Sequence, residues 1–172
     1  MQCKFCAAPL PKQGLTCNYC NKLNPLNHKI LGNIKETKSY SNHLCPCCHI
    51  TLETIKDATV TLAYCSQCDG ILIEEEEFEK LIEYRVNPSN KFNPLYLRFI
   101  QDHPRDNRKK AQFHNCPICS ESMSIINYKK QSGIILDACE EHGVWLDGGE
   151  LRQIIEWYEV GGEKKLQGNS WV

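Results

Sequence analysis

The stretch that decides the fold is Cys116-Pro-Ile-Cys119, followed by residues 139–151, CEEHGVWLDGGEL. Cys116 and Cys119 form one pair with a two-residue gap, and Cys139 and His142 form a second pair after nineteen intervening residues. A two-residue gap lets both side chains of one turn reach the same ion, and two facing turns complete a tetrahedron of zinc ligands. The stretch therefore predicts a zinc site with three sulfurs and one imidazole nitrogen.

The same spacing occurs twice more towards the N-terminus, with ten and then sixteen residues between the pairs. The three sets use eleven of the twelve cysteines and predict three zinc ions per chain. The predicted metal ligands are Cys3, Cys6, Cys17 and Cys20 in the first site, Cys45, Cys48, Cys65 and Cys68 in the second, and Cys116, Cys119, Cys139 and His142 in the third.

Other cysteine chemistries fit the pattern less well. The first residues lack the features of a secretory signal, so we expect a cytoplasmic protein in which thiols stay reduced and disulfides are disfavoured. Iron in a cage of four thiolates suits the first two sites, but the histidine of the third favours zinc. Residues 45–49 match a haem-attachment pattern without an export signal, and residues 116–119 match a redox motif without its βαβ setting. A thiol redox switch that releases zinc remains a low-ranked alternative.

Cys47 is the cysteine left over. It could replace Cys45 or Cys48 as a ligand, but the Cys-Pro-x-Cys form recurs at Cys116, which favours Cys45 and Cys48. We therefore expect Cys47 to be a bystander. All four corners of each site are already filled, so the remaining histidines are expected on the surface or in turns. They are His28, His43, His49, His103 and His114.

The second and third sites look like copies of one unit. Residues 65–78 align with residues 139–151 once a single residue is dropped before the glycine. Each unit has about 40 residues, which is below the size that holds a core without a metal or another cross-link. Duplication predicts that both units share one fold.

Each unit reads as a short strand, a metal-binding turn and a helix. Residues 59–64 and 133–138 have the β-branched or apolar character of strands, and Gly70 and Gly143 are expected to supply a positive φ after the turn. Asp147 and Glu150 form an acidic capping box that predicts a helix over about 147–159. In the earlier unit, Phe78, Leu81 and Ile82 have helical spacing after the acidic start 74–77.

The sequence predicts a small zinc-stabilised α+β fold of three zinc ribbons in series, the second and third each followed by a short amphipathic helix. The expected divisions are a ribbon over 1–30, a linker over 31–44, ribbons with helices over 45–84 and 116–159, a connector over 85–115 and a flexible tail over 160–172. Basic and acidic blocks alternate along the chain in step with these divisions, which suggests separate modules joined by basic connectors.

One family resemblance is specific enough to name. Residues 116–119 and 137–151, with the string Trp145-Leu-Asp-x-Gly-Glu-Leu, resemble the bacterial TFIIB-type, or transcription-factor-type, zinc ribbons. Residues 45–84 resemble the family more weakly, because Leu72 replaces the tryptophan and Glu76 the second glycine. The N-terminal unit is similar to generic short zinc ribbons. The resemblance implies a zinc-ribbon fold with Cys116, Cys119, Cys139 and His142 as ligands.

Metal chemistry and charge narrow the function. Four protein ligands per ion are typical of closed structural sites, so we expect no enzyme activity. Ionised thiolates make the two repeats more acidic still, which favours a scaffold or adaptor that binds another protein over a nucleic-acid or transcription-machinery binder. A redox switch or zinc enzyme ranks lower. No apolar run is long enough to cross a membrane.

Two segments each allow more than one role. The basic cluster Arg105–Lys110 suits a nucleic-acid contact, a solvated linker or a partner of the acidic helices. Trp171 in the tail suits a docking contact or no contact at all.

Overall fold

The structure is a computed structural model that describes residues 3, 6–10, 17–21, 35–56, 60–86, 113–130 and 132–163. Side chains of residues 35–41 and of Arg85 lie outside this description. So do residues 87–112 of the expected connector, with the basic cluster Arg105–Lys110, and the Trp171 tail, His28 and His103.

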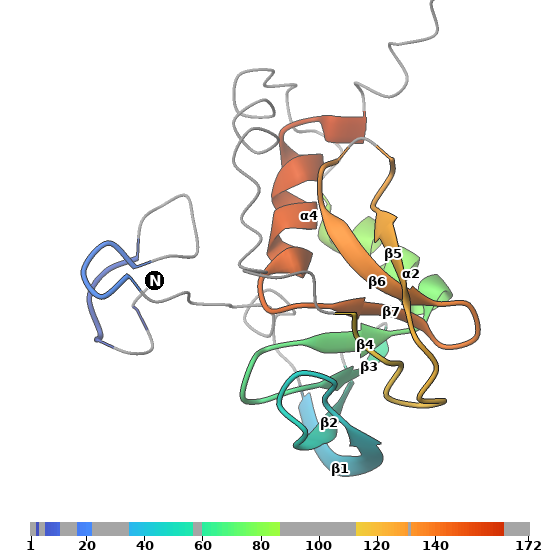
Figure 1. Ribbon diagram of the computed structural model, residues 1–172. Helices are drawn as coiled ribbons and strands as arrows, with labels where there is room; N and C mark the ends of the chain where they lie inside the picture. Colours follow the sequence, from blue (N-terminus) through green and yellow to red (C-terminus); the bar gives the residue numbers. More distant parts are fainter. Residues whose placement is uncertain are drawn as a thin grey trace, which may run out of the picture.

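One antiparallel sheet of seven strands holds both repeats (Figure 1). Its order is β1-β2-β3-β4-β7-β6-β5, so the last strand of the earlier repeat pairs with the last strand of the later one. The strands are β1 Lys35–Leu44, β2 Thr51–Lys56, β3 Thr61–Tyr64, β4 Ile71–Ile73, β5 Ser124–Asn127, β6 Ile135–Cys139 and β7 Gly143–Leu146. The helices are α2 Glu75–Arg85 and α4 Glu150–Glu159. The predicted α+β fold is confirmed.

The β4–β7 pairing is symmetric between the repeats. Leu72 lies opposite Trp145, and these two residues are equivalent in the repeat alignment. Ile71 pairs with Leu146 and Ile73 with Val144, so exchanging the repeats leaves the register unchanged. The seam therefore resembles the self-complementary interface of a twofold dimer, built within one chain.

This seam differs from the separate modules that the charge blocks suggest. A lone ribbon would leave β4 or β7 as an exposed apolar edge, which invites pairing with another strand. Ile71, Ile73, Trp145 and Leu146 are all buried in the joined sheet. Pairing β4 with β7 therefore gives both edge strands a hydrogen-bonded neighbour, and the two repeats form one sheet.

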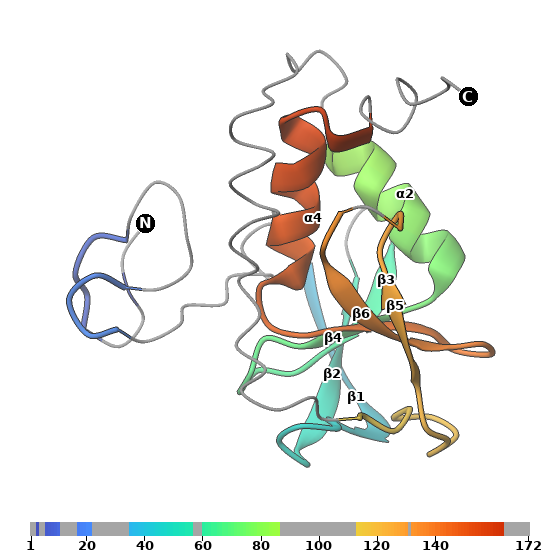
Figure 2. The same cartoon turned by 45° about the horizontal axis from the view of Figure 1, so that its top comes forward.

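The two faces of the sheet have different roles. Helices α2 and α4 lie on one face (Figure 2), and Leu81 of α2 and Ile154 of α4 belong to the same buried cluster as Ile71 and Val144. On the other face Leu72 and Trp145 pack with Leu52, Met123 and cysteines of the second and third sites. Alternating residues of β4 and β7 thus divide between a helix-covered core and a metal-binding face.

The helix starts differ from each other. The acidic start of α2 agrees with expectation, because Glu74 is its N-cap and three glutamates fill its first turn. α4 begins at Glu150, not at Asp147, and its N-cap is Gly149 with φ +105°. Only half of the predicted capping box forms: the Glu150 carboxylate accepts the N–H of Asp147 at 2.8 Å. The Asp147 carboxylate instead accepts the indole N–H of Trp145 at 2.8 Å, so it is not a cap.

The expected linker over 31–44 is wrong for residues 35–44, which form β1 and pair with β2. Eight of the ten residues in its sequence, KETKSYSNHL, are polar, and Tyr40 and Leu44 alone do not make an apolar alternation that would indicate a strand. An edge strand is held by backbone hydrogen bonds to one neighbour and does not require that pattern.

The two glycines after the metal turns are needed for different reasons. Gly143 has φ +85°, as expected, whereas the left-handed residue at the earlier turn is Asp69, with φ +59°. At Gly70 the constraint is space: an added Cβ would overlap the Trp145 indole, with Cη2 only 2.7 Å away. The indole therefore packs directly on the backbone of the other repeat's metal turn.

We predict that Gly70→Ala destabilises the zinc-loaded protein by about 2 kcal/mol, because a buried ring must shift. The cost should fall sharply in a Trp145→Leu background, where leucine, the residue at the equivalent position 72, leaves room. Urea unfolding of the four variants of this double-mutant cycle measures the coupling.

The matched control is Gly133→Ala, whose Cβ meets nothing within 4 Å and whose φ of +75° adds only a local backbone cost. Its effect should be the same with Trp145 or Leu at position 145. Equal costs of Gly70→Ala in both backgrounds would contradict the packing that we describe.

Candidate metal centres

The third site lies where two turns face each other. In the first turn, Cys116 accepts the N–H of Ser120 on its carbonyl at 2.9 Å and the N–H of Ile118 on its sulfur at 3.4 Å. The second turn joins β6 to β7. His142 Nδ1 lies 3.6 Å from Cys116 Sγ and 3.4 Å from Cys139 Sγ, and the sulfurs of Cys119 and Cys139 are 3.8 Å apart. The four predicted ligands thus converge.

The second site repeats this construction in the earlier ribbon. The Cys45 carbonyl accepts the N–H of His49 at 2.9 Å, and its sulfur accepts the N–H of Cys48 at 3.3 Å. In the facing turn, the Cys65 carbonyl accepts the N–H of Asp69 at 2.9 Å. Cys45 Sγ and Cys68 Sγ are 3.7 Å apart. Backbone N–H groups aimed at sulfur stabilise thiolates, which are the form that binds metal.

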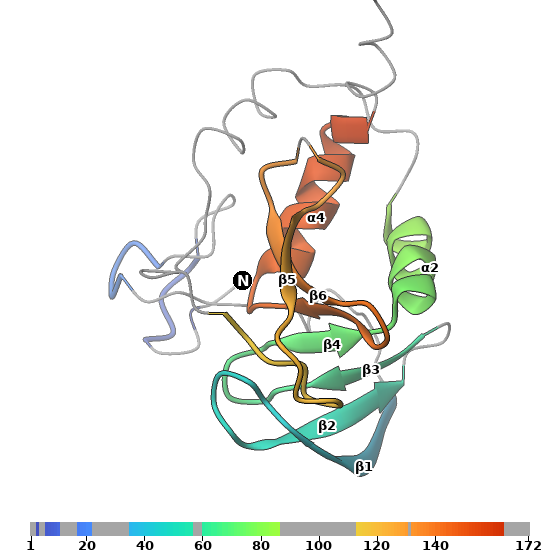
Figure 3. The same cartoon turned by 45° about the vertical axis from the view of Figure 1, so that its right-hand side comes forward.

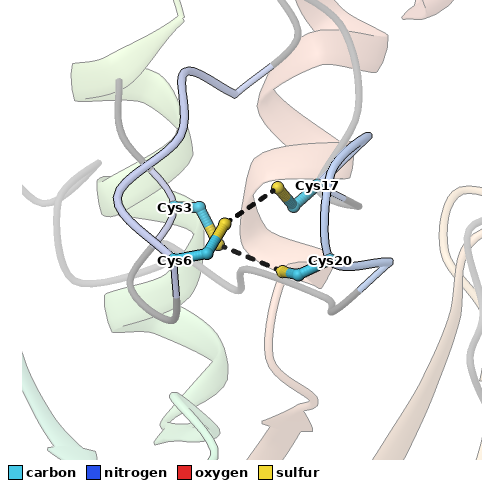
Figure 4. A group of neighbouring side chains, drawn as sticks. All are labelled: Cys3, Cys6, Cys17 and Cys20. Atoms are coloured by element: carbon cyan, nitrogen blue, oxygen red, sulfur yellow. Dashed lines mark hydrogen bonds between the residues drawn. The ribbon is translucent and has the colours of Figure 1, made fainter.

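The N-terminal site gathers its four sulfurs from two short segments (Figure 4). Cys3 Sγ lies 3.6 Å from Cys20 Sγ, and Cys6 Sγ lies 3.6 Å from Cys17 Sγ. The only buried residue packed with these cysteines, among those described, is Leu10. So small a cluster depends on its metal for folding.

All three clusters fit zinc. Four sulfurs at about 2.3 Å from a tetrahedral zinc ion lie about 3.8 Å from one another. The observed separations of 3.6–3.8 Å between sulfurs match that value. The donor sets, four cysteines twice and three cysteines with one histidine, are those of structural zinc sites. The structure is thus compatible with three zinc ions per chain.

Without a cation the clustered thiols cannot all ionise. Burial raises the pKa of the Cys116 thiol to about 11. Burial also raises the pKa of Cys139, but the N–H of Glu141 and the nearby His142 more than offset it and lower the value to about 7. The Cys116 thiol therefore ionises less readily than the Cys139 thiol. A divalent cation at the centre stabilises the remaining thiolates, with release of their protons.

Cys47 and His114 differ from the sequence expectation. His114 is buried and not at the surface, and its Nε2 lies 3.3 Å from Cys47 Sγ. Cys47 is exposed and lies outside the second group of four cysteines, and its thiol is beside the His114 ring. His49 is an exposed turn residue with φ +57°, as expected, and His43 is half-buried at the end of β1. His114 was not singled out from the sequence, because each zinc site already had four ligands. A signal was present, since a histidine stands two residues before the first ligand in both repeats.

A family model described as transcription factor zinc-finger, a TFIIB-type zinc ribbon, matches residues 44–84 and again residues 115–157. Both repeats are TFIIB-type zinc ribbons. The resemblance found in the sequence is therefore confirmed for the two repeats, and the N-terminal cluster lies outside the matched segments. No curated protein and no solved structure matches the chain. In the part of the chain that the structure describes, no helix is long and apolar enough to cross a membrane.

We predict that His142→Ala removes one zinc ion and weakens both TFIIB-type ribbons, because β7 of the damaged ribbon is the neighbour of β4. Hydrogen exchange should show faster exchange of amides in β3 and β4 as well as in β6 and β7, and elemental analysis should show the zinc loss.

The control is His49→Asn, since His49 is exposed and asparagine tolerates its positive φ. It should keep full zinc content and wild-type exchange. Unchanged protection of β3 and β4 in His142→Ala would mean that the ribbons fold independently.

Proposed function

We propose that the paired TFIIB-type ribbons form a non-catalytic adaptor that binds another protein along the open edge of strand β5. The observation that carries this proposal is the exposure of that edge. Within the described residues β5 pairs with β6 alone, and Ile125 and Ile126 are 42% and 38% exposed. Figure 3 shows β5 at the front of the molecule, with β6 behind it.

Natural sheets protect their edge strands with lysine, proline or bulges. The sequence of β5 is SIIN, with neither lysine nor proline, and all four residues are exposed. Successive isoleucines point to opposite faces of the sheet, so an added strand could contact one of them on each face. Ile118, on the first turn of the third metal site, is also 40% exposed.

Charge favours a protein partner over a nucleic acid. Residues 45–83 carry two lysines against nine acidic residues, and residues 116–159 carry three basic residues against eight acidic ones. Each site of four thiolates and one zinc ion adds further negative charge. A duplex binder needs a basic face for phosphate contacts, which these ribbons lack in composition. The partner that fits is an apolar strand with basic flanks.

The three metal sites support a structural role. Each has four protein ligands, whereas catalytic zinc keeps one position for water or substrate. We place this adaptor in a reducing compartment such as the cytoplasm, where thiols remain available to zinc.

The test compares proteins captured from a lysate by the immobilised zinc-loaded chain and by Ile125→Lys/Ile126→Lys, which places charge on the edge strand. We expect a discrete partner whose recovery falls at least tenfold with the double variant, and no retention of the chain on duplex DNA at low salt. The control is Tyr84→Lys, which changes a still more exposed large hydrophobic residue on α2. This variant should capture the partner normally.

Equal capture by all variants would exclude the β5 edge. Retention on DNA that falls steeply with added salt would favour the nucleic-acid alternative.

A further inference from the structure

A fourth group of metal-binding side chains lies between the two TFIIB-type ribbons. Cys47, His114 and Asp147 each offer one ligand atom, and these atoms all lie within 4.8 Å of one another. Cys47 Sγ is 3.3 Å from His114 Nε2 and 3.7 Å from Asp147 Oδ1. None of the three belongs to the ligand sets of the three ribbon sites.

We propose that Cys47, His114 and Asp147 bind a fourth zinc ion, in a site with three protein ligands and one position open to solvent. In a tetrahedral site, zinc lies about 2.3 Å from sulfur and about 2.0–2.2 Å from nitrogen or oxygen. A sulfur ligand and a nitrogen or oxygen ligand of the same ion are then about 3.5–3.7 Å apart. The Cys47–Asp147 distance of 3.7 Å falls in this range, and the Cys47–His114 distance of 3.3 Å is slightly shorter. The Cys47–His114 distance is also close to the Cys–His separations of 3.4 and 3.6 Å in the third ribbon site.

A buried carboxylate orients the histidine. His114 Nδ1–H donates to Asp137 Oδ2 at 2.8 Å, and both side chains are buried. This bond fixes the tautomer in which Nε2 carries a lone pair, and it directs that lone pair towards Cys47. Carboxylate support of the far ring nitrogen is the usual arrangement for a histidine that binds metal.

The aspartate ligand is also held in place. The Trp145 indole N–H donates to Asp147 Oδ1 at 2.8 Å, and the Asp147 backbone N–H donates to Glu150. A carboxylate oxygen has a second lone pair for the metal. Since Cys47 is exposed, the site opens to solvent on the sulfur side.

The site depends on the pairing of the ribbons and exists on one side only. Cys47 comes from the second site's turn, whereas His114 and Asp147 come from the later repeat. In the repeat alignment, Cys47 corresponds to Ile118, His114 to His43 and Asp147 to Glu74. Asp137, which orients His114, corresponds to Ala63. The counterpart thus lacks the thiol and the orienting carboxylate, which supplies a natural control within the same chain.

Cys47, His114 and Asp137 also resemble a nucleophile, a base and an orienting carboxylate. The Asp147 carboxylate beside the sulfur argues against that use, because its negative charge opposes a free thiolate. The same carboxylate favours a cation. One thiolate, one carboxylate and a neutral imidazole balance the two charges of zinc, and binding releases the thiol proton to solvent.

Native mass spectrometry of the full chain during zinc titration tests the proposal. We expect three ions that resist a chelator and a fourth that a chelator removes first, because it has fewer protein ligands. The Cys47→Ser variant should bind only three zinc ions. The Asp137→Asn variant should lose affinity for the fourth ion alone, by about 10–100-fold. His43→Ala, the symmetry-related control, should still reach four.

A wild-type maximum of three ions, or four ions in Cys47→Ser, would overturn the proposal. A fall to two tightly bound ions in Cys47→Ser would also overturn it, since Cys47 would then be a ligand of the second site. A second readout is alkylation of Cys47 by iodoacetamide, which added zinc should slow. Rapid alkylation that is independent of zinc would reject the metal site in favour of the nucleophile.

Discussion

Tetrahedral coordination by paired cysteines is the constraint on which the rest of this structure depends. Each TFIIB-type ribbon has only about 40 residues, too few to bury a self-sufficient core. In each of them two tight turns are brought together at one point, and backbone N–H groups around Cys45 and Cys116 direct sulfur lone pairs to that point. Zinc fixes the turns, the turns fix the strands that leave them, and the helices then cover the face of the sheet that remains apolar.

The seam between the ribbons adds what the metal cannot supply. Zinc organises each ribbon locally, but it leaves β4 and β7 as apolar edges. Their symmetric pairing around Leu72 and Trp145 closes both edges and merges two small cores into one. Trp145 is the asymmetric element of this seam: it packs on Gly70 of the other ribbon and holds Asp147 in place. The two repeats differ at this position and also at Cys47, Asp137 and Asp147, so the seam is symmetric in register but not in side chains.

The sequence predicts the local parts of the structure and misses the parts that depend on pairing. A two-residue gap between ligands is a local constraint, so the clusters around Cys48 and Cys119 could be assigned without coordinates. Strand β1 could not, because its polar residues show no alternation. The seam could not either, since a repeat alignment equates Leu72 with Trp145 without placing them side by side. His114 appeared spare because its partners, Cys47 and Asp137, lie 67 and 23 residues away in the chain.

The central claim is that zinc holds the two ribbons in one continuous sheet. Nuclear Overhauser effects between the backbone protons of Leu72 and Trp145 test it most directly, measured first with zinc bound and then after a chelator has removed it. We expect a strong cross-strand signal in the zinc-loaded protein and its loss on zinc removal. Absence of the signal with zinc bound would mean that the ribbons are separate, and its persistence without zinc would mean that the sheet does not depend on the metal.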